Sequence, residues 1–478
     1  MATVLKARKL YKPSEEPSLG EFLAFLEENY PGEVLRVTRE VDPIFEVTAV
    51  LAKLEKLNKF PCVIFERVKG SDIPVVTNLH ASFPRLALAL GLPYDATIEE
   101  FIQEYSRRES NPIEPVLVDS GPCQEIVLTG DQVDVTKLPI LKYHELDAGR
   151  YITLGFCTMK DPETGVPNVG IYRLMVKGPN KFGIQISETA HGHYIMKKYH
   201  KMGQPAPMAV FIGGHPAINM GLLSFTPIDV NEFAIAGAMI GQPLKLVKCK
   251  TIDVEVPAVS EIVLECEIHP YEREPEAPFG EYPGTYGPQR INPVVYCKAI
   301  TMRRNPYYHS SFVGHPDNLL LSGVTRNSYI YKMCRVASGS VKAAYVPPSG
   351  RCRYICYVSM EKFIEGDPKN VAMAAFAADP FLKYVVVVDH DVNILNDSEV
   401  LHAIATRVRA HQDVFMVTYS RGSPLDPASY DPQSGSHLVT KVGIDATRKA
   451  DYPKEISVPG TDEVDLSKYF GDLFHETK

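Results

Sequence analysis

The run Tyr384-Val385-Val386-Val387-Val388-Asp389 constrains the fold of this chain more than any other segment. Four successive valines favour a β-strand, and the run lacks the alternating polar residues of a strand with one face in water. We therefore expect both faces to be buried, in a parallel sheet covered by helices. Helical patterns at 371–378 and 398–408 flank the strand, and another strand is expected at 414–419. Residues 311–478 are thus predicted to form a C-terminal α/β domain.

Two further domains are expected before it. Up to residue 115, amphipathic helices alternate with short strands, which indicates a small N-terminal α/β domain ending in the linker Asn111–Pro115. In residues 116–310, short β-rich runs follow one another between glycines and prolines, as in a sandwich or a barrel. One helix interrupts them, from Asn231 or Glu232 to Ile240, ended by Gly241. The predicted fold class is therefore mixed α+β in three domains.

Local signals predict several boundaries. Ser18-Leu19-Gly20-Glu21 has the spacing of a capping box and should begin a helix. Asp42-Pro43 should cap the next helix. The chain beyond Gly422 is expected to be loop-rich, with a polar tail after Phe470. The main β-rich runs of the second domain are 125–128, 151–159, 171–176, 208–212, 261–268 and 294–301.

The composition is that of an ordinary globular protein. Of 478 residues, 45% are apolar and 23% charged, and the net charge of −8 without a Lys/Arg run argues against a nucleic-acid partner. Met1–Arg8 lacks the apolar core of a secretory signal, and no apolar stretch reaches the length of a membrane span, so a cytoplasmic location is expected. The nine cysteines, of which Cys352 and Cys356 are the closest pair, are expected to be reduced core thiols.

Common catalytic signatures are absent from the sequence. It contains no phosphate-binding P-loop, no H-E-x-x-H, no G-x-S-x-G and no G-x-G-x-x-G after a strand. Phosphoryl transfer, zinc proteolysis, serine hydrolysis and NAD chemistry of the Rossmann type therefore lack support.

The run Glu276-Ala277-Pro278-Phe279-Gly280-Glu281-Tyr282-Pro283-Gly284 carries two carboxylates five residues apart. Its prolines and glycines predict a loop held in one shape. Aromatic residues on either side of Glu281 favour a partly apolar pocket, in which the pKa of a carboxyl group rises and the group can act as a general acid. The alternative is a solvated acidic turn.

A second group of polar residues lies in the central domain. Asn168 precedes the expected strand 171–176, which contains Arg173, and a buried arginine needs a counter-charge or an anionic ligand. His191 follows another β-rich run, and Glu232 stands in the first turn of its helix. Asn, His and Glu together suit Mn²⁺ or Mg²⁺. Taken singly, they could be a turn residue, a surface or core histidine, and a charge at a helix start.

In this combination the motifs resemble those of the UbiD-type decarboxylases. The run Pro167–Arg173 resembles the family's Asn-to-Arg motif, as do His191, Glu232 within Asn231–Ala238, and Glu276-x₄-Glu281. The segments 387–392 and Thr406-Arg407 are also similar, and the match covers nearly the whole chain in order. Ala190 stands where some members carry glutamine, and His390 where many carry an acidic residue.

The resemblance implies reversible, non-oxidative decarboxylation of an aromatic, heteroaromatic or α,β-unsaturated carboxylic acid, with release of CO₂ and with prenylated FMN as cofactor. It implies that Glu281 donates the proton while Arg173 and Glu276 orient substrate and cofactor. Asn168, His191 and Glu232 would hold Mn²⁺ (or Mg²⁺), with K⁺ alongside. The implied cofactor-binding residues are Asn168, Val169, Gly170, Ile171, Tyr172, Arg173, Ala190, His191 and Glu232.

The resemblance also implies a central split β-barrel of the flavin-reductase type, between the N-terminal α/β domain and a C-terminal α/β oligomerisation domain. A homo-oligomer (dimer or hexamer) and a flavin prenyltransferase that supplies the cofactor would follow. Two other functions stay open from the residues: an FMN-dependent oxidoreductase on the same barrel, and a non-catalytic assembly subunit. The substrate is expected to be a flat acid that stacks on the flavin. The sequence does not indicate which acid it is.

Overall fold

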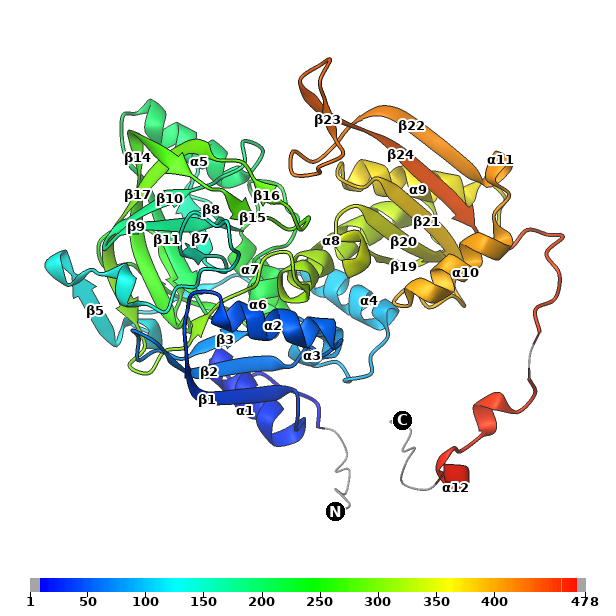
Figure 1. Cartoon of the computed structure of the whole chain (residues 1–478), viewed down its shortest axis with the longest axis horizontal. Coiled ribbons are helices and arrows are strands. Elements are labelled where there is room, and N and C mark those ends of the chain that lie inside the picture. The colour runs from blue at the N-terminus through cyan, green and yellow to red at the C-terminus, as the bar shows by residue number, and fades with distance from the viewer. Residues whose placement is uncertain (1–8, 457, 471–478) are drawn as a thin grey trace.

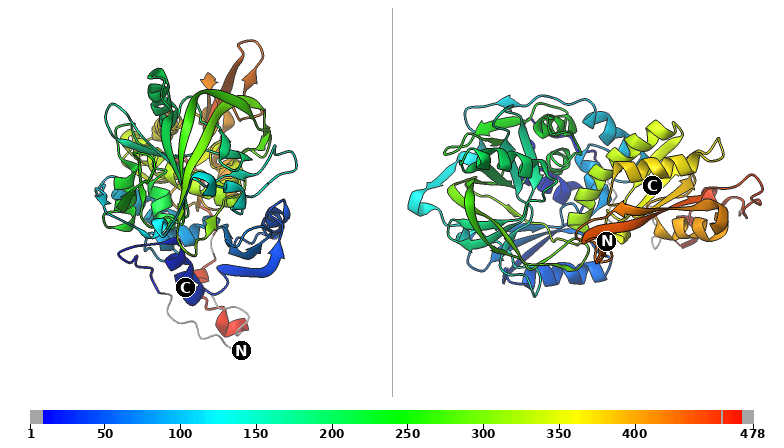
Figure 2. Two further views of the ribbon diagram at one scale, coloured as in Figure 1. Left: turned by 90° about the vertical axis from the view of Figure 1, so that its left-hand side faces the viewer. Right: turned by 90° about the horizontal axis from the view of Figure 1, so that it is seen from above.

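The structure is a computed structural model that describes residues 9–456 and 458–470 of the chain. The expectations for Met1–Arg8 and for the tail after Phe470 fall outside these described residues. Three parts are visible, with an N-terminal part (blue) below, a β-rich central part (cyan to green) on one side and a C-terminal part (yellow to red) on the other (Figure 1). The view from above keeps the central and C-terminal parts side by side (Figure 2).

The N-terminal part combines a four-stranded sheet with helices, in agreement with the expected α/β class. The sheet order is β1-β2-β3-β18, and the last strand, β18 (Tyr308–His309), comes from far along the chain and pairs in parallel with β3. The other elements are α1 (Leu19–Asn29), β1 (Val34–Val41), α2 (Glu46–Lys56), β2 (Cys62–Val68), β3 (Val75–Thr77), α3 (Phe83–Ala89) and α4 (Ile98–Glu109).

One of the two predicted helix starts in this part is correct and one is wrong. Ser18 caps α1 by accepting a hydrogen bond from the backbone N–H of Glu21 at 3.2 Å. Asp42-Pro43 does not cap α2, which begins at Glu46 after Phe45 in a left-handed conformation (φ 68°). The Asp42 carboxylate instead accepts a hydrogen bond from the backbone of Ile44 at 2.8 Å, because a side chain this short bonds readily within its own turn.

A nine-stranded sheet dominates the central part, in the order β6-β9-β10-β17-β14-β11-β7-β8 with β5 beside β17. Its elements include the long antiparallel pair β14 and β17. The strands are β5 (Ile126–Thr129), β6 (Tyr151–Ile152), β7 (Phe156–Lys160), β8 (Pro167–Ile171), β9 (Leu174–Gly178), β10 (Lys181–Ile184), β11 (Ala206–Ile212), β14 (Ile262–Glu276) and β17 (Arg290–Met302).

Two strands predicted as continuous are interrupted. Residues 151–159 divide into β6 and β7, and residues 171–176 divide into β8 and β9 at Tyr172-Arg173. Because β8 lies at one end of the sheet order and β9 lies near the other, the chain passes between the two ends within two residues. From Ile171 to Leu174 the chain can span at most ~11 Å, so the sheet must curl until its ends approach each other. Arg173 therefore lies at the seam of a curled sheet and not within a strand.

Smaller elements complete the central part. Its helices are α5 (His191–Lys201), α6 (Pro216–Gly221) and α7 (Glu232–Ile240), and its short strands are β4 (Val116–Leu117), β12 (Lys245–Lys248), β13 (Glu255–Pro257), β15 (Phe279–Gly280) and β16 (Tyr286–Gly287). The predicted ends of α7 are confirmed: Asn231 caps its start, and Gly241 ends it at a φ of 75°. A methyl group on Gly221 would lie 2.6 Å from the Ala236 backbone, so glycine lets α6 approach α7 closely.

The C-terminal part is a six-stranded sheet with helices. Its elements are α8 (Pro316–Ala337), β19 (Val341–Tyr345), β20 (Ile355–Met360), α9 (Asp367–Ala378), β21 (Tyr384–Asp389), α10 (Asp397–Arg407), α11 (Ala410–Asp413), β22 (Val414–Arg421), β23 (Tyr430–Asp431), β24 (Ser436–Ala446) and α12 (Ser467–Phe470). β21 lies between β20 and β24, parallel to both, with Val385–Val388 buried as predicted. Beyond Gly422 the sequence missed β24, which inserts between β21 and β22, whereas residues 423–429 and 447–456 contain no helix or strand, as expected.

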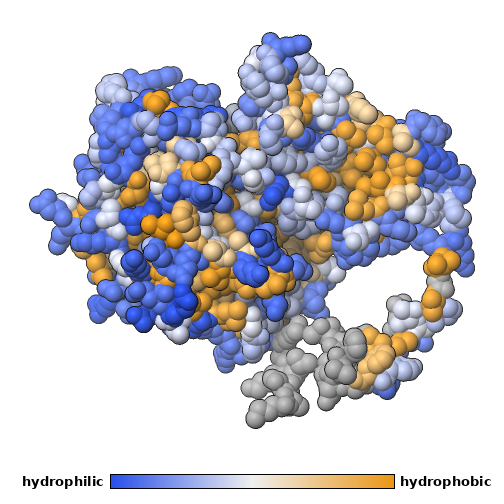
Figure 3. Space-filling model, in the orientation of Figure 1, coloured by the Kyte–Doolittle hydropathy of each residue, from blue (hydrophilic) through white to orange (hydrophobic). Residues whose placement is uncertain are grey.

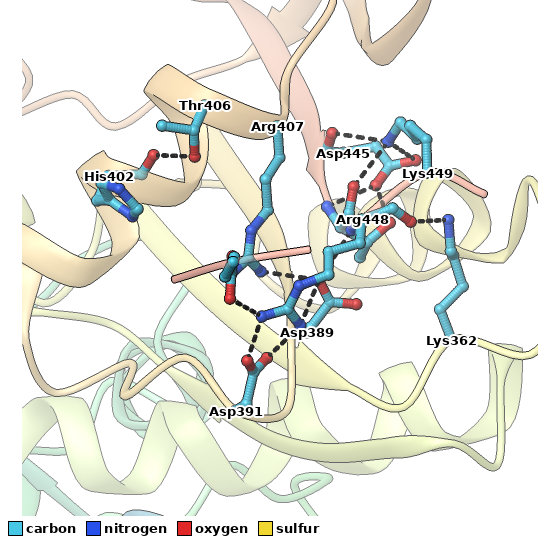
Figure 4. A network of polar contacts seen from close by, with 11 residues as sticks. Lys362, Asp389, Asp391, His402, Thr406, Arg407, Asp445, Arg448 and Lys449 are labelled. Atoms are coloured by element: carbon cyan, nitrogen blue, oxygen red, sulfur yellow. Dashed lines mark hydrogen bonds and ion pairs between the residues drawn. The ribbon is translucent and has the colours of Figure 1, made fainter. Parts of the chain in front are cut away.

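Ion pairs gather beyond the carboxyl end of β21 (Figure 4). Arg407 donates to Asp389 at 2.8 Å, and Arg448 donates from its backbone to the same carboxylate at 2.8 Å and from its side chain to Asp391 at 2.9 Å. These contacts tie α10 and the segment after β24 to the end of β21. Asp389 and Asp391, from the 387–392 motif, and Arg407 therefore stabilise the C-terminal sheet.

Two further expectations can be compared with the structure. All nine cysteines carry free thiols, including Cys352 and Cys356, and eight of the nine are buried. Within residues 9–456 and 458–470, no helix has both the length and the apolar character needed to cross a bilayer.

Candidate active site

Arg173 is bound to a fully buried carboxylate at the seam of the curled sheet. Its Nε and Nη2 donate to the two oxygens of Glu276 at 2.9 and 2.8 Å, in the forked geometry that suits a guanidinium and a carboxylate. The Glu276 side chain is 0% exposed and that of Arg173 is 12% exposed. Asn292 adds a hydrogen bond to Glu276 at 3.0 Å and another to Gln185 at 2.7 Å. Glu276, itself held by Asn292, thus fixes the orientation of the Arg173 guanidinium.

The same guanidinium contacts Glu281, which differs from the arrangement expected from the sequence. Nη1 of Arg173 donates to Glu281 Oε1, so both carboxylates of the Glu276-x₄-Glu281 run converge on one arginine. The aromatic ring of Phe279, expected beside Glu281, lies over the Arg173 guanidinium at 5.1 Å. Tyr151 packs on Phe279 with their ring centroids 4.4 Å apart. The apolar residues therefore cover the charged cluster and do not form a separate pocket for one carboxylate.

A short hairpin holds Glu281 in place. Glu276 is the last residue of β14, and β15 pairs with β16 so that the backbone N–H of Glu281 donates to Thr285 at 2.9 Å. Gly280 donates to Asp147 at 2.8 Å and has no room for a side chain, because a methyl group there would lie 2.2 Å from His144 Nδ1. The segment is thus held in one shape, as predicted, by the pairing of β15 with β16 and by the contact of Gly280 with Asp147.

Asn168 and Glu232 form a second buried cluster. Glu232 is 3% exposed, and it accepts hydrogen bonds from Asn168 Nδ2 at 2.8 Å, the backbone of Val169 at 3.2 Å and Thr226 at 3.3 Å. Burial raises the pKa of Glu232 to about 7, and these hydrogen bonds together with its own backbone N–H offset part of that rise. All these donors are neutral, and within residues 9–456 and 458–470 the buried Glu232 carboxylate forms no ion pair.

His191 lies on the neighbouring helix. It is the first residue of α5, and both α5 and α7 pack on β8, which carries Asn168. Burial lowers the pKa of His191 and so favours the neutral imidazole, the form that binds metal ions. In the described ranges, however, no three His, Cys, Asp or Glu side chains are grouped closely enough to hold a metal. The structure joins Asn168 and Glu232 directly, and His191 begins a helix that packs on the same strand.

The other expected cofactor residues surround the same place. Val169 is buried, and Gly170 and Ile171 are half-buried at the end of β8. The Tyr172 ring fills the space next to Gly170 and Gly192, where added methyl groups would meet its hydroxyl at 2.8 and 2.6 Å. Ala190 precedes α5 and its side chain cannot cap this helix, while its backbone carbonyl accepts from the N–H of His193 at 3.0 Å.

Several residues of the site were not predicted. Asn292, Gln185, Asp147 and Tyr151 hold Glu276, Gly280 or Phe279 in position. The local sequence around these four residues contains no motif that marks them as part of a site. Only their pairing across the sheet brings them to the site.

Three parts of one protein family match the chain consecutively. The N-terminal domain of 3-octaprenyl-4-hydroxybenzoate carboxy-lyase (UbiD) matches residues 24–105, the Rift-related domain 116–316 and the C-terminal domain 320–446. Among curated proteins, anhydromevalonate phosphate decarboxylase of Methanosarcina mazei is 37% identical over 90% of this chain and 95% of its own length.

Solved structures agree with this match. The UbiD-class enzyme HmfF from Pelotomaculum thermopropionicum, in complex with FMN, is 41% identical and superimposes with a TM-score of 0.88 over 95% of this chain and 100% of that one. An evolved dimeric form of HmfF in complex with prFMN is 39% identical with a TM-score of 0.85, over 95% of this chain and 99% of that one. The chain therefore belongs to the UbiD family of carboxy-lyases.

Proposed function

We propose that this protein decarboxylates an aromatic, heteroaromatic or α,β-unsaturated carboxylic acid with prenylated FMN as cofactor. The observation that carries the proposal is the convergence of Glu276 and Glu281 on Arg173 at the seam of the curled sheet. A guanidinium held from behind suits a substrate carboxylate, and a carboxyl group beside it suits proton return. Similar structures that hold FMN and prFMN support the cofactor assignment.

The residues around β8 fit the metal and the phosphate that such a cofactor brings. A cation would supply the counter-charge that the buried Glu232 lacks, and Asn168, His191 and Glu232 would hold Mn²⁺ or Mg²⁺, with K⁺ nearby. The uncapped start of α5 offers backbone N–H groups to a phosphate. We assign the curled sheet to the split β-barrel of the flavin-reductase type, within domains of residues 1–115, 116–310 and 311–478.

The mechanism follows from the contacts of Arg173. The cofactor, when bound, supplies the electron sink that no amino-acid side chain provides. The substrate carboxylate binds Nη1 of Arg173 and displaces Glu281, while Glu276 and Asn292 keep the guanidinium in place. Glu281, separated from its counter-charge, takes up a proton, and it then delivers that proton to the carbon from which CO₂ leaves.

The proposal is tested on protein produced together with a flavin prenyltransferase and purified without oxygen. Flavin absorbance and bound Mn²⁺ should accompany the protein, and CO₂ release should be measured on aryl, heteroaryl and acrylic acids. A phosphorylated unsaturated acid belongs in the set because of the relative from Methanosarcina mazei. Protein that retains neither flavin nor metal under these conditions would refute the assignment.

The assembly proposed for the protein is a homo-oligomer, a dimer or a hexamer, in the cytoplasm. Apolar residues gather on the surface of the C-terminal part (Figure 3), and on β22 Met416 and Val417 are exposed. Exposed apolar faces of this kind commonly contact another chain. Sedimentation of the purified protein distinguishes a monomer from either oligomer.

A further inference from the structure

Tyr282, directly after Glu281, reaches into the C-terminal part of the molecule. Its side chain is buried, and its hydroxyl lies 2.7 Å from Ser423 Oγ and accepts a hydrogen bond from the Tyr354 hydroxyl at 3.1 Å. Tyr354 precedes β20, and Ser423 follows β22. The Arg353 guanidinium lies over the Tyr282 ring, 4.5 Å from its centroid. Glu281 and Tyr282 begin the turn of the hairpin, which the Gly284 N–H closes by donating to the Glu281 carbonyl at 2.9 Å. From this turn Glu281 meets Arg173, while Tyr282 meets residues next to strands of the C-terminal sheet.

The backbone around Glu281 is held from the same side. A methyl group on Gly314, just before α8, would lie 3.0 Å from the carbonyl oxygen of Glu281. Arg351 donates to the carbonyl oxygen of Gly314 at 3.0 Å, and its guanidinium lies against Gly284. The hairpin is thus enclosed between the central sheet and residues that belong to the C-terminal part.

We propose that Tyr282 is a positioning residue that holds the backbone of Glu281 next to Arg173, within reach of the substrate carbon, by anchoring the hairpin to Ser423 and Tyr354. The role of Glu281 in this statement rests on the proposed function. A displacement of the C-terminal part moves Ser423 and Tyr354 together, and through Tyr282 it moves the proton donor relative to the arginine. The distance between Glu281 and Arg173 therefore depends on the position of the C-terminal part relative to the central sheet.

The test uses Tyr282→Phe and Ser423→Ala, with Tyr286→Phe as the matched control. Tyr286 lies on the opposite strand of the same hairpin, but its hydroxyl accepts from Leu146 at 3.2 Å at the exposed surface, a bond that contributes little. Hydrogen–deuterium exchange is followed at the amides of Glu281 and Gly284, which bond within the hairpin. These amides should exchange at least ~10-fold faster in Tyr282→Phe and Ser423→Ala than in the wild type or the control.

Turnover supplies the second measurement. Tyr282→Phe should lower kcat about 10-fold with KM and flavin content unchanged, because only the placement of the proton donor changes. Adding Ser423→Ala should cost little more, because both substitutions remove the same bond. Exchange and kcat equal to those of Tyr286→Phe, or full additivity in the double variant, would overturn the proposal. A wild-type protein that decarboxylates no acid would refute the proposed function, while amide exchange would still decide whether Tyr282 anchors the hairpin.

Discussion

Arg173 holds Glu276 through two parallel hydrogen bonds of 2.9 and 2.8 Å, and the Glu276 carboxylate has no contact with water. Removing the arginine would leave a buried charge unpaired. Arg173→Ala should therefore lower the free energy of unfolding by ~3–5 kcal/mol and weaken substrate binding. Urea unfolding measures the first effect and KM the second. Arg173→Ala/Glu276→Gln should regain part of the lost stability, and a double variant less stable than Arg173→Ala alone would contradict this account.

Glu281→Gln preserves the shape of the side chain but removes its ability to carry a proton. Turnover should fall by ~10²-fold or more, while flavin and metal bind as in the wild type. Deuterium incorporation at the reacting carbon, measured in D₂O with the decarboxylated product, reports proton return directly. Incorporation as fast as in the wild type would show that another group donates the proton.

Glu232→Gln replaces a buried carboxylate by a neutral amide of the same size. Removing the buried charge favours the variant, while the amide nitrogen of Gln cannot accept a hydrogen bond and leaves one donor unpaired, so we expect a stability close to that of the wild type without metal. Its Mn²⁺ content, measured by elemental analysis after dialysis, should drop at least ~10-fold, since the proposed ligand set loses its one negative charge. Glu261→Gln, at a buried carboxylate near Arg303, should leave the metal content unchanged.

His215 makes the fold sensitive to acid. Its imidazole is fully buried against Tyr11, caps α6 by accepting from the Ala217 backbone at 3.2 Å, and has its pKa lowered by burial to about 3. Between pH 6.5 and about 3 the unfolded chain binds a proton here that the native state excludes, so the free energy of unfolding falls as the pH falls through this range. At pH 5 the loss from this one group is about 2 kcal/mol.

His215→Asn retains a side-chain acceptor for the cap and does not titrate. Urea unfolding at pH 7 and pH 5 should show a smaller loss of stability in this variant than in the wild type. The exposed His402 provides the control, because His402→Asn should leave the loss unchanged. An equal loss in all three proteins would exclude His215 as a source of acid sensitivity.

The sequence was most informative where a residue's role depends on its near neighbours along the chain. The buried valines of β21, the cap of α1 and the ends of α7 each follow from a few adjacent residues, and each is confirmed. Asp42-Pro43 failed because the same residue types can cap a helix or close a turn, and the choice depends on packing.

Sequence patterns could not show which strands meet across the curled sheet. In the sequence the 171–176 run resembles a single strand, but Ile171 belongs to β8 and residues 174–176 to β9, which lie at or near opposite ends of the sheet order. Arg173, expected within a strand, therefore lies at the seam. Glu281, expected in an aromatic pocket, contacts the same guanidinium as Glu276. Asn292 and Asp147 reach the site only through long-range pairing, which one sequence does not reveal.

The strand β18 has a consequence for how the protein is made. The N-terminal sheet takes its last strand from Tyr308–His309, so a ribosome must add more than two hundred residues after β3 before that sheet is complete. Until then the β3 edge offers unpaired backbone groups to other chains. Synthesis proceeds at ~5–20 residues per second, so the nascent protein stays open at this edge for ~10 s or longer. Chaperone dependence during translation would then be set by the first hundred residues, although the catalytic groups all come later.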